Sequence, residues 1–217
     1  LTGTLKTCGG GACPWGWIAC EEHNEAGHGY AFLCSPDAER VAKPDRLDGY
    51  GRFTHEAVRL DPATLHAYMT EDRADGCLYR FVPANQDQPF VGKLWALAVA
   101  GRPRLETALD MSPGTRVTVE WVEVKEPAPK EDTVRLQAHE LGAAKFRRGE
   151  GAFFHAGALY FATTLGGRKD RGQIFKLNLG NDGKADELEL LAESPNADVL
   201  DSPDNITVAP WGHVLMA

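Results

Sequence analysis

Four side chains that can bind metal ions occupy the same position of a repeated sequence pattern. Each lies six residues before a turn residue, and the turn residues are Pro14, Pro62, Ala156 and Pro210. Counting back from these turns gives Cys8, Glu56, Glu150 and Asp204. Each of the four begins a short strand-like run, which is followed by the turn and a second apolar run. A thiol and three carboxylates that point the same way are the donor set of a cation site.

Further acidic residues follow the second strand of two of these units. Glu21 and Glu22 end that strand in the first unit, and Glu71 and Asp72 end it in the second. Successive side chains of a strand point to opposite faces, so we expect one member of each pair to face the cation site. The sequence leaves open which member does so, and a solvated strand end is the alternative for Glu22 and Asp72.

A basic residue and a histidine accompany the acidic register. Arg148 lies two residues before Glu150 and therefore on the same side of an extended strand. A guanidinium beside bound cations is suited to hold an oxyanion such as phosphate in a bidentate grip, and its alternative role is a salt bridge to Glu150. His55 precedes Glu56, so one of the two could bind metal while the other orients it or faces outward.

Short apolar runs between Gly, Pro and Asp turns predict an all-β protein, because helical periodicity is nearly absent. The expected strands are 15–22, 29–34, 67–72, 77–83, 93–99, 116–124, 158–164, 173–179, 205–210 and 213–216. Antiparallel strands arrayed in repeated units are typical of β-propeller blades. In a propeller the innermost strands surround one axis, so residues at one register converge there from distant parts of the chain.

The repeats predict a single β-propeller portion over residues 1–217. Residues 84–145 interrupt the pattern, and we expect an irregular blade or an insertion there, with strands at 91–100 and 115–125 and a short helix at 137–146. The chain begins without Met and ends within an apolar run. We interpret it as an interior piece of a longer protein and expect these residues alone to be inactive.

The composition is that of a globular protein with an excess of acids. Of 217 residues, 31 are Asp or Glu and 23 are Lys or Arg, giving a net charge of −8. This balance argues against a broad nucleic-acid surface and fits a cluster of acids that binds cations. The sequence has no run of about 18 apolar residues that would predict a membrane span. The five cysteines have no CxxC spacing, and Cys20, Cys34 and Cys77 are expected to be buried in apolar strands.

Long segments of the sequence resemble the PhoX-type alkaline phosphatases, a bacterial family formerly known as a domain of unknown function. The matching segments are CGGGACPWGWIACEE at 8–22, GRFTHEAV at 51–58, YMTEDRADGCLYRFVP at 68–83, FRRGEG at 146–151, LYFATTLGGRKDRGQIFKL at 159–177 and LDSPDNITVAPWG at 200–212. They occur in the family's order and cover most of the chain except 84–145. Gly149 stands where the family usually has Pro, and PWGW is one residue shorter than the family's PWGTW.

This resemblance implies a six-bladed propeller, of which the chain is an incomplete portion, with iron and calcium ions at the axis. It implies an enzyme that hydrolyses phosphate monoesters. Cys8 is then an iron ligand, Glu21 or Glu22, Glu56, Glu150 and Asp204 bind iron or calcium, Arg148 grips phosphate, and Asn205 lies beside the substrate. The expected partners are small phosphate esters, with no nucleic acid or membrane, and the protein is expected to be a monomer in the periplasm or secreted.

Metal-assisted phosphoryl transfer needs no side-chain nucleophile, and the sequence has no GxSxG, HExxH or Walker motif. Two alternatives remain open at this stage. One is a calcium-stabilised propeller that acts as a binding module without catalysis. The other is a different propeller hydrolase, a lactonase or a phosphodiesterase.

Overall fold

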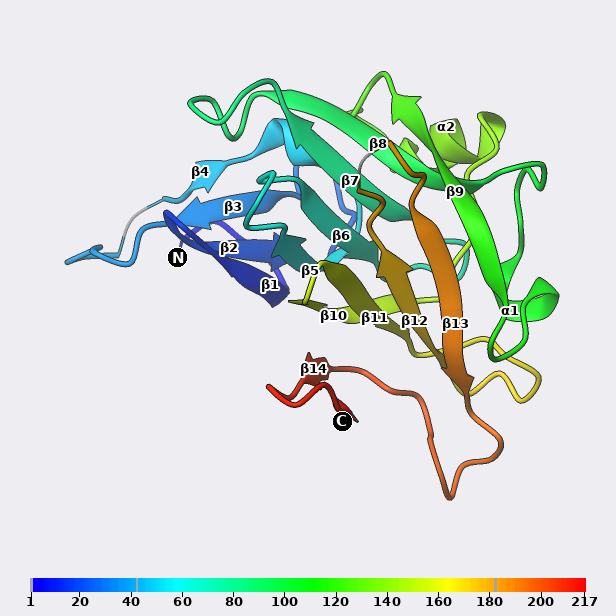
Figure 1. Ribbon diagram of the computed structural model, residues 1–217. Coiled ribbons are helices and arrows are strands. Elements are labelled where there is room, and N and C mark those ends of the chain that lie inside the picture. Colours follow the sequence, from blue (N-terminus) through cyan, green and yellow to red (C-terminus); the bar gives the residue numbers. More distant parts are fainter. Residues whose placement is uncertain (1, 42, 182) are drawn as a thin grey trace.

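The regular secondary structure of the chain is mostly β-strand, with two short α-helices and one 3-10 helix in the described residues (Figure 1). The structure is a computed structural model that describes residues 2–41, 43–181 and 183–217. Within these ranges, thirteen strands form one large sheet and two more form a separate hairpin. The all-β class predicted from the sequence is therefore confirmed. The large sheet does not close on itself, because β10 and β4 are its two ends.

Three antiparallel meanders follow one another along the chain. The first contains β1 (Thr7–Cys13), β2 (Gly16–Glu21), β3 (Ala31–Cys34) and β4 (Asp45–Arg46). The second follows the short 3-10 helix η1 (Asp48–Tyr50) and contains β5 (His55–Leu60), β6 (Ala67–Glu71), β7 (Leu78–Pro83) and β8 (Gly92–Val99). The third contains β10 (Gly149–His155), β11 (Ala158–Thr163), β12 (Gln173–Asn178) and β13 (Glu187–Glu193). The hairpin is formed by β14 (Ile206–Val208) and β15 (Val214–Met216).

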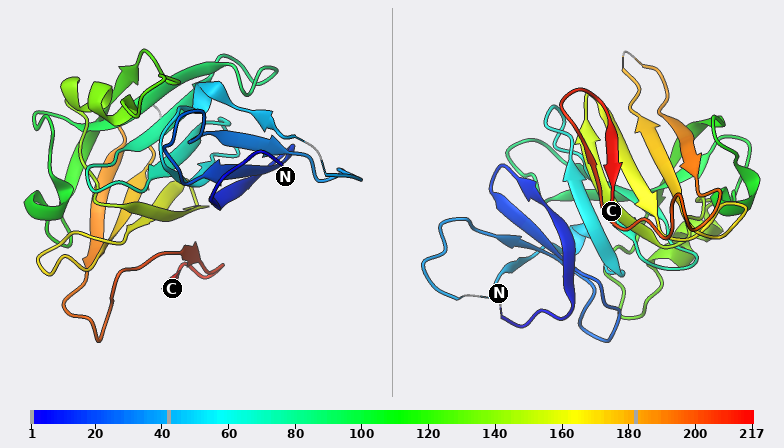
Figure 2. Two further views of the ribbon diagram at one scale, coloured as in Figure 1. Left: turned by 180° about the vertical axis from the view of Figure 1, so that it is seen from behind. Right: turned by 90° about the horizontal axis from the view of Figure 1, so that it is seen from below.

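The first strands of successive units lie next to one another (Figure 2). β1 pairs in parallel with β5 through Gly10 and Ala57. β10 packs against β5, and β14 packs against β10. The strand starts at which the predicted site residues lie are therefore neighbours in space, although these residues are far apart in the sequence.

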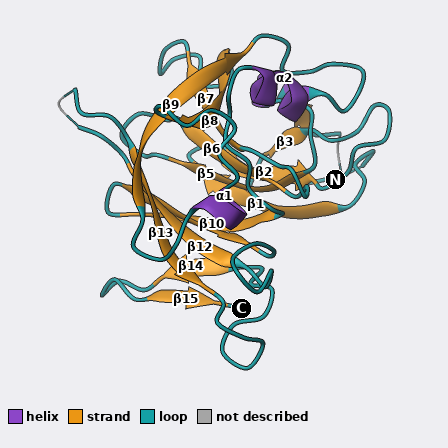
Figure 3. Ribbon diagram, turned by 90° about the vertical axis from the view of Figure 1, so that its right-hand side faces the viewer, coloured by secondary structure: helices purple, strands orange, loops and turns teal. Residues whose placement is uncertain are grey.

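Residues 84–145 contribute strands to the sheet and two short helices. β9 (Arg116–Val124) pairs with β8 on one side and with β13 on the other, so it connects the second and third meanders. The helices α1 (Thr107–Asp110) and α2 (Val134–Glu140) lie in the connections between strands and are not part of the sheet (Figure 3). The two strands expected here, at 91–100 and 115–125, correspond to β8 and β9.

The helix expected at 137–146 begins and ends earlier, at Val134 and Glu140. It stops because Gly142 adopts a left-handed backbone with φ of 97°. The N–H groups of Ala143 and Gly142 then close the helix end by donating to the carbonyls of Ala138 and His139, at 2.9 and 3.0 Å. This is the Schellman arrangement that glycine favours.

Two strands were not anticipated, the two-residue β4 and the longer β13. The β13 sequence ELELLAE is rich in Leu, Glu and Ala, which favour helices. Tertiary pairing overrides this preference, because β13 lies between β12 and β9 and buries Leu188 and Leu190. The expected strands elsewhere agree with the observed ones to within a few residues at their ends.

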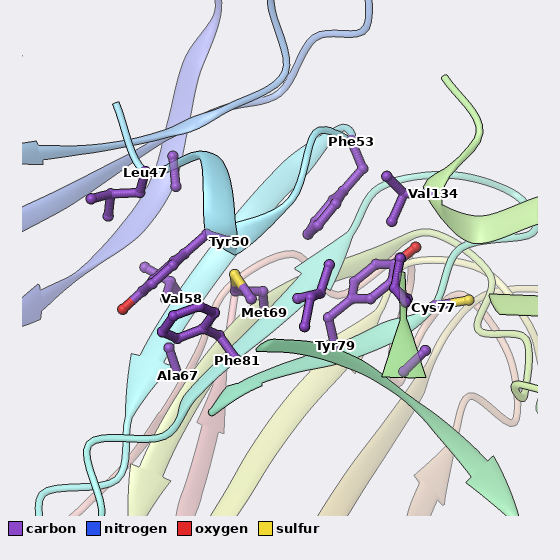
Figure 4. Close-up of a cluster of buried hydrophobic side chains, with 14 of the residues drawn as sticks. Leu47, Tyr50, Phe53, Val58, Ala67, Met69, Cys77, Tyr79, Phe81 and Val134 are labelled. Atoms are coloured by element: carbon purple, nitrogen blue, oxygen red, sulfur yellow. The ribbon is translucent and has the colours of Figure 1, made fainter. Parts of the chain in front are cut away.

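Aromatic and aliphatic side chains from neighbouring strands fill the core. In the cluster of Figure 4, the rings of Tyr50 and Phe81 lie 4.6 Å apart, and Phe53 stacks on Tyr79 at 4.3 Å. Burying each such side chain contributes about 1.5–3 kcal/mol. Tyr50 of η1 and Phe53, two residues before β5, thus both pack on β7, which holds the segment that leads into β5.

All five cysteines are free thiols. Cys20 and Cys77 are buried, as the sequence predicted. The prediction that Cys34 is buried was wrong, because it ends β3 beside a loop and is half-buried.

Candidate metal centre

The starts of four first strands bring the predicted ligands together. Cys8, Glu56 and Glu150 are each the second residue of β1, β5 and β10, and Asp204 lies two residues before β14. The donor atoms of Cys8, Glu22 and Glu56 lie within 4.8 Å of one another, and so do those of Glu56, Glu150 and Asp204. Glu56 belongs to both groups. The result is a pair of adjoining three-ligand clusters that share one carboxylate.

An irregularity in the strand pairing begins at or contains the predicted site residue in each of three units. The register between first and second strand shifts between Cys8 and Gly11, between His55 and Val58, and between Gly149 and Ala152. Such bulges bend a strand and turn a side chain away from the regular alternation. The shift begins at Cys8 in the first unit and spans Glu56 and Glu150 in the other two, so these side chains can depart from the alternation of a regular strand.

Two glycines let the first strands approach closely enough to form the clusters. A Cβ on Gly9 would lie 2.8 Å from the Glu56 carboxylate and 2.7 Å from its carbonyl oxygen. A Cβ on Gly151 would lie 2.9 Å from the carbonyl oxygen of Asp204, to which the Gly151 N–H donates at 2.9 Å. Any other residue at these positions would push the neighbouring strand and its ligand away.

The carboxylates of the clusters repel one another, and those of Glu56 and Glu150 are also buried. Burial, and then the charges of Asp72, Glu56 and Asp204, raise the pKa of Glu150 to about 9. Burial and a hydrogen bond with Asp72 raise the pKa of Glu22 to about 7. A bound cation would reverse this penalty, because an opposite charge favours the ionised carboxylates. The donor set and its crowding therefore fit cation binding.

The Cys8 thiol contacts one of these carboxylates. Its Sγ donates to Oε1 of Glu56 at 3.3 Å. Burial and the Glu56 carboxylate raise the pKa of Cys8 to about 12. Without a cation this thiol stays protonated, whereas a bound metal ion deprotonates a coordinating thiol.

The two glutamates that end β2 have different environments. Glu22 lies in the cluster with Cys8 and Glu56. Glu21 is fully buried and accepts hydrogen bonds from the N–H groups of Leu5, Gly29 and Tyr30, and lies 2.8 Å from the His28 ring. Burial opposes ionisation of Glu21, but His28 and these donors outweigh it and lower its pKa. Glu21 therefore anchors the loop after β2, and of the two only Glu22 is available to a cation.

The same division holds for the pair that ends β6. Glu71 is buried and accepts from the Cys77 N–H at 3.0 Å and from the Tyr79 hydroxyl at 2.8 Å. Asp72 points instead to the guanidinium of Arg148. The alternation expected from the sequence therefore applies to both strand ends. Asp72 is a site residue that the sequence left undecided, and its position equivalent to Glu22 was the available signal.

Arg148 extends along the edge of the clusters. Its Nε and Nη2 donate to the two carboxylate oxygens of Asp72 at 2.7 and 2.8 Å, and Nη2 lies 3.5 Å from Glu150. These partners, with Asp72 first, raise the pKa of Arg148 above its usual range. The neighbouring Arg147 points away to Glu106 and Asp170.

The remaining predicted residues have clear positions. Asn205 is exposed beside Asp204, and its Oδ1 accepts the Ile206 N–H at 3.2 Å. His55 faces the core rather than the cluster: its ring stacks on Phe53 at 3.6 Å, and its Nε2 lies 3.1 Å from the Gly51 carbonyl oxygen. Burial lowers the pKa of His55 to about 4. Of the pair His55 and Glu56, Glu56 is the one that faces the cluster.

With this geometry in place, comparison with known proteins identifies the family. The family model described as alkaline phosphatase PhoX matches residues 1–217, the whole chain. The chain belongs to the PhoX family. Neither a curated protein nor a solved structure matches the chain significantly.

Membership of the PhoX family implies alkaline phosphatase activity that depends on metal ions. The acidic clusters of this PhoX chain are consistent with such a dependence. Its helices, in the part of the chain that the structure describes, all lack the length and apolar character that a membrane crossing requires.

Proposed function

We propose that this chain carries the metal centre of an alkaline phosphatase that hydrolyses phosphate monoesters. The observation that best supports this function is the convergence of two ligand groups on the shared carboxylate of Glu56, with the Arg148 guanidinium beside Glu150. Phosphoryl transfer depends on positioning and on neutralising the charge of the phosphoryl oxygens. Adjoining cation sites next to a guanidinium suit this task.

The two ligand groups differ in donor chemistry. Cys8, Glu22 and Glu56 combine a sulfur donor with carboxylates, which suits iron. Glu56, Glu150 and Asp204 offer oxygen atoms only, which suits calcium. When bound, the cations supply charge neutralisation and an activated water for attack on phosphorus. Glu56 keeps the two sites at a fixed spacing because it contributes to both.

Substrate recognition is assigned to side chains at the edge of the clusters. The Arg148 side chain is 42% exposed, and its Nη1 faces outward from the Asp72 pair, so it can donate to a phosphoryl oxygen. The Asn205 amide N–H group, next to Asp204, is a second candidate donor. These two residues would hold the phosphoryl group while the ester group extends into solvent.

The architecture proposed for this site is the axial end of a six-bladed β-propeller. The three meanders and the β14–β15 hairpin have the strand order of consecutive blades, and their first strands are neighbours. The chain would supply part of the ring of blades, so these residues alone are expected to be inactive. We also propose a monomer that acts on small phosphate esters in the periplasm or outside the cell.

The direct test is hydrolysis of p-nitrophenyl phosphate by the full-length, metal-loaded protein. We expect turnover that a chelator abolishes. Arg148→Ala should reduce kcat/KM by about 10²–10³-fold, as expected for loss of a donor to developing charge. Arg147→Ala is the matched control and should retain activity, because Arg147 pairs with Glu106 and Asp170 away from the clusters.

The alternatives predict other results. A calcium-stabilised binding module would gain heat stability with calcium and show no turnover. A lactonase or phosphodiesterase would turn over its own substrate class in a panel and leave the monoester intact. Either outcome would refute the proposed hydrolysis of phosphate monoesters.

A further inference from the structure

The Arg148 guanidinium is held along one edge by a single carboxylate. Nε and Nη2 donate to Oδ1 and Oδ2 of Asp72 at 2.7 and 2.8 Å, which is the parallel two-bond geometry that fixes the plane of a guanidinium. The Asp72 side chain is only 9% exposed, so water competes weakly for this pair. The orientation of Arg148 is therefore set by Asp72 rather than by solvent.

The backbones on both sides of this pair are also fixed. The Asp72 N–H donates to the Thr54 carbonyl oxygen at 3.0 Å. The Arg148 N–H donates to the Arg73 carbonyl oxygen at 2.8 Å. The Arg148 carbonyl oxygen in turn accepts the Thr164 N–H at 2.9 Å. Arg148 has φ of 56°, a left-handed conformation that a long side chain adopts rarely and that surrounding contacts must maintain.

Contacts of the buried Glu71 hold the strand end that carries Asp72. Glu71, the preceding residue, is buried and holds the Cys77 N–H and the Tyr79 hydroxyl. Arg135 of α2 lies 4.0 Å from the same carboxylate and pairs with Asp75 at 2.9 Å. Because Glu71 is held on one face of the strand, Asp72 is directed to the other face, toward Arg148.

The pair leaves a defined part of the guanidinium free. Asp72 uses Nε and one hydrogen of Nη2, so Nη1 and the second hydrogen of Nη2 remain at the outer end. Nη2 also lies 3.5 Å from Glu150, and Glu22 contributes negative charge nearby. Without Asp72, the guanidinium would turn toward these cluster carboxylates and away from the position that a substrate oxyanion occupies.

We propose that Asp72 is a positioning residue: it orients Arg148 so that the outer end of the guanidinium meets a phosphoryl group. In the described part of the chain, neither ligand group includes Asp72, and each of its two carboxylate oxygens accepts a hydrogen bond from Arg148. Asp72 therefore acts through Arg148 and not through the cations. This inference rests on the proposed function, since it assigns the grip on phosphate to Arg148.

The test compares Asp72→Asn with Asp72→Glu in the full-length, metal-loaded protein. The probe is inorganic phosphate, measured by calorimetry and as a competitive inhibitor of p-nitrophenyl phosphate hydrolysis. We expect Asp72→Asn to weaken phosphate binding about tenfold and to raise KM by a similar factor, the loss of roughly one charge-assisted contact. The iron and calcium contents should be unchanged, and Asp72→Glu should restore part of the affinity.

A matched control is a second pair of the same geometry. Asp48→Asn removes a carboxylate that accepts from Nε and Nη2 of Arg46, away from the clusters, and should leave phosphate binding unchanged. Asp72→Asn added to Arg148→Ala should weaken phosphate binding no further than Arg148→Ala alone. If Asp72→Asn fails to fold, Arg148→Lys is measured in its place. Lysine keeps the positive charge but cannot donate two parallel hydrogen bonds to Asp72, so its phosphate binding should weaken by a similar factor.

Two results would overturn the inference. One is unchanged phosphate affinity in Asp72→Asn, and the other is loss of bound metal, which would make Asp72 a ligand. Failure of the proposed function is distinguishable, because calorimetry needs no turnover. A protein that binds phosphate in an Asp72-dependent way but hydrolyses no ester would refute the phosphatase and support the positioning role.

Discussion

The thiol of Cys8 and the carboxylate of Glu56 meet at 3.3 Å, across the junction between β1 and β5. These residues are 48 positions apart, and each is the second residue of its strand. The contact joins the first two meanders at the point where the two ligand groups adjoin. In a metal-bound protein, the proton that Cys8 shares with Glu56 would be replaced by a cation.

Cys8→Ser should remove iron and spare calcium. Serine keeps the size of the side chain, but its hydroxyl is a weaker ligand for iron than a thiolate. We expect the iron content of the full-length protein to fall to background, with phosphatase activity reduced at least about 100-fold. Cys34→Ser is the control, because Cys34 is a free thiol too but lies at the far end of β3, away from the clusters. Retention of iron in Cys8→Ser would contradict the assignment.

Glu21 and Glu22 should respond to substitution in opposite ways. Glu21→Gln removes a buried charge that accepts three backbone N–H groups, so it should lower the free energy of unfolding by about 1–3 kcal/mol and leave the metal content unchanged. Glu22→Gln should reduce the metal content without destabilising the metal-free protein, because it removes repulsion within the cluster. Thermal unfolding with chelator, together with elemental analysis, would reveal a reversed pattern if the roles were exchanged.

The sequence predicted which side chains converge, but it did not predict how they are oriented. Repetition of Cys8, Glu56, Glu150 and Asp204 before a turn was enough to predict convergence, because equivalent strand starts in a repeated unit lie at one end of the fold. The bulges that redirect the side chains depend on pairing between strands, and no local pattern encodes pairing. The choice between Glu21 and Glu22 depended on loop N–H groups that come from residues up to 16 positions away.

Contacts between distant residues also decide features that the local sequence did not predict. β13 has a helix-favouring sequence and becomes a strand because β9, from residues 84–145, pairs with its outer edge. The contact of Asp72 with Arg148 joins residues 76 positions apart. Single-sequence patterns carry no information about such a partner. Buried cysteines followed the apolar pattern at Cys20 and Cys77 but not at Cys34, which a loop end exposes.

The metal-free protein should lose stability as the pH rises from about 5 to 9. Glu22 and Glu150 have folded-state pKa values of about 7 and about 9, above the ordinary value of 4.5. The folded state therefore binds more protons than the unfolded state in this window, and deprotonation favours unfolding. Glu71, with a pKa raised to about 7 chiefly by burial, acts in the same direction.

Calcium should oppose this loss for Glu150, whose group with Glu56 and Asp204 offers oxygen ligands only, so the stabilising effect of calcium should be larger at pH 8.5 than at pH 6. Thermal unfolding at both pH values, with chelator and with calcium, measures the difference. A calcium effect that is equal at the two pH values, or larger at pH 6, would contradict the assignment of these carboxylates to a cation cluster.

Gly151→Ala should separate the two ligand groups. A Cβ at this position would lie 2.9 Å from the Asp204 carbonyl oxygen and 2.8 Å from Asn205 Oδ1, so it would displace the segment that carries Asp204. We expect calcium content to fall while iron remains. Gly157→Asn is the control at the other end of β10, because Gly157 has open space around it and asparagine tolerates its left-handed backbone. Equal loss of both metals in Gly151→Ala would count against separate sites.

The central claim is that one carboxylate, Glu56, serves two adjoining cation sites. Elemental analysis of the full-length protein and of Glu56→Gln tests it most directly. The prediction is that wild-type protein contains both iron and calcium and that Glu56→Gln loses both, whereas Cys8→Ser loses iron alone. Wild-type protein without either metal, or a Glu56→Gln variant that keeps its full complement of both, would contradict the claim.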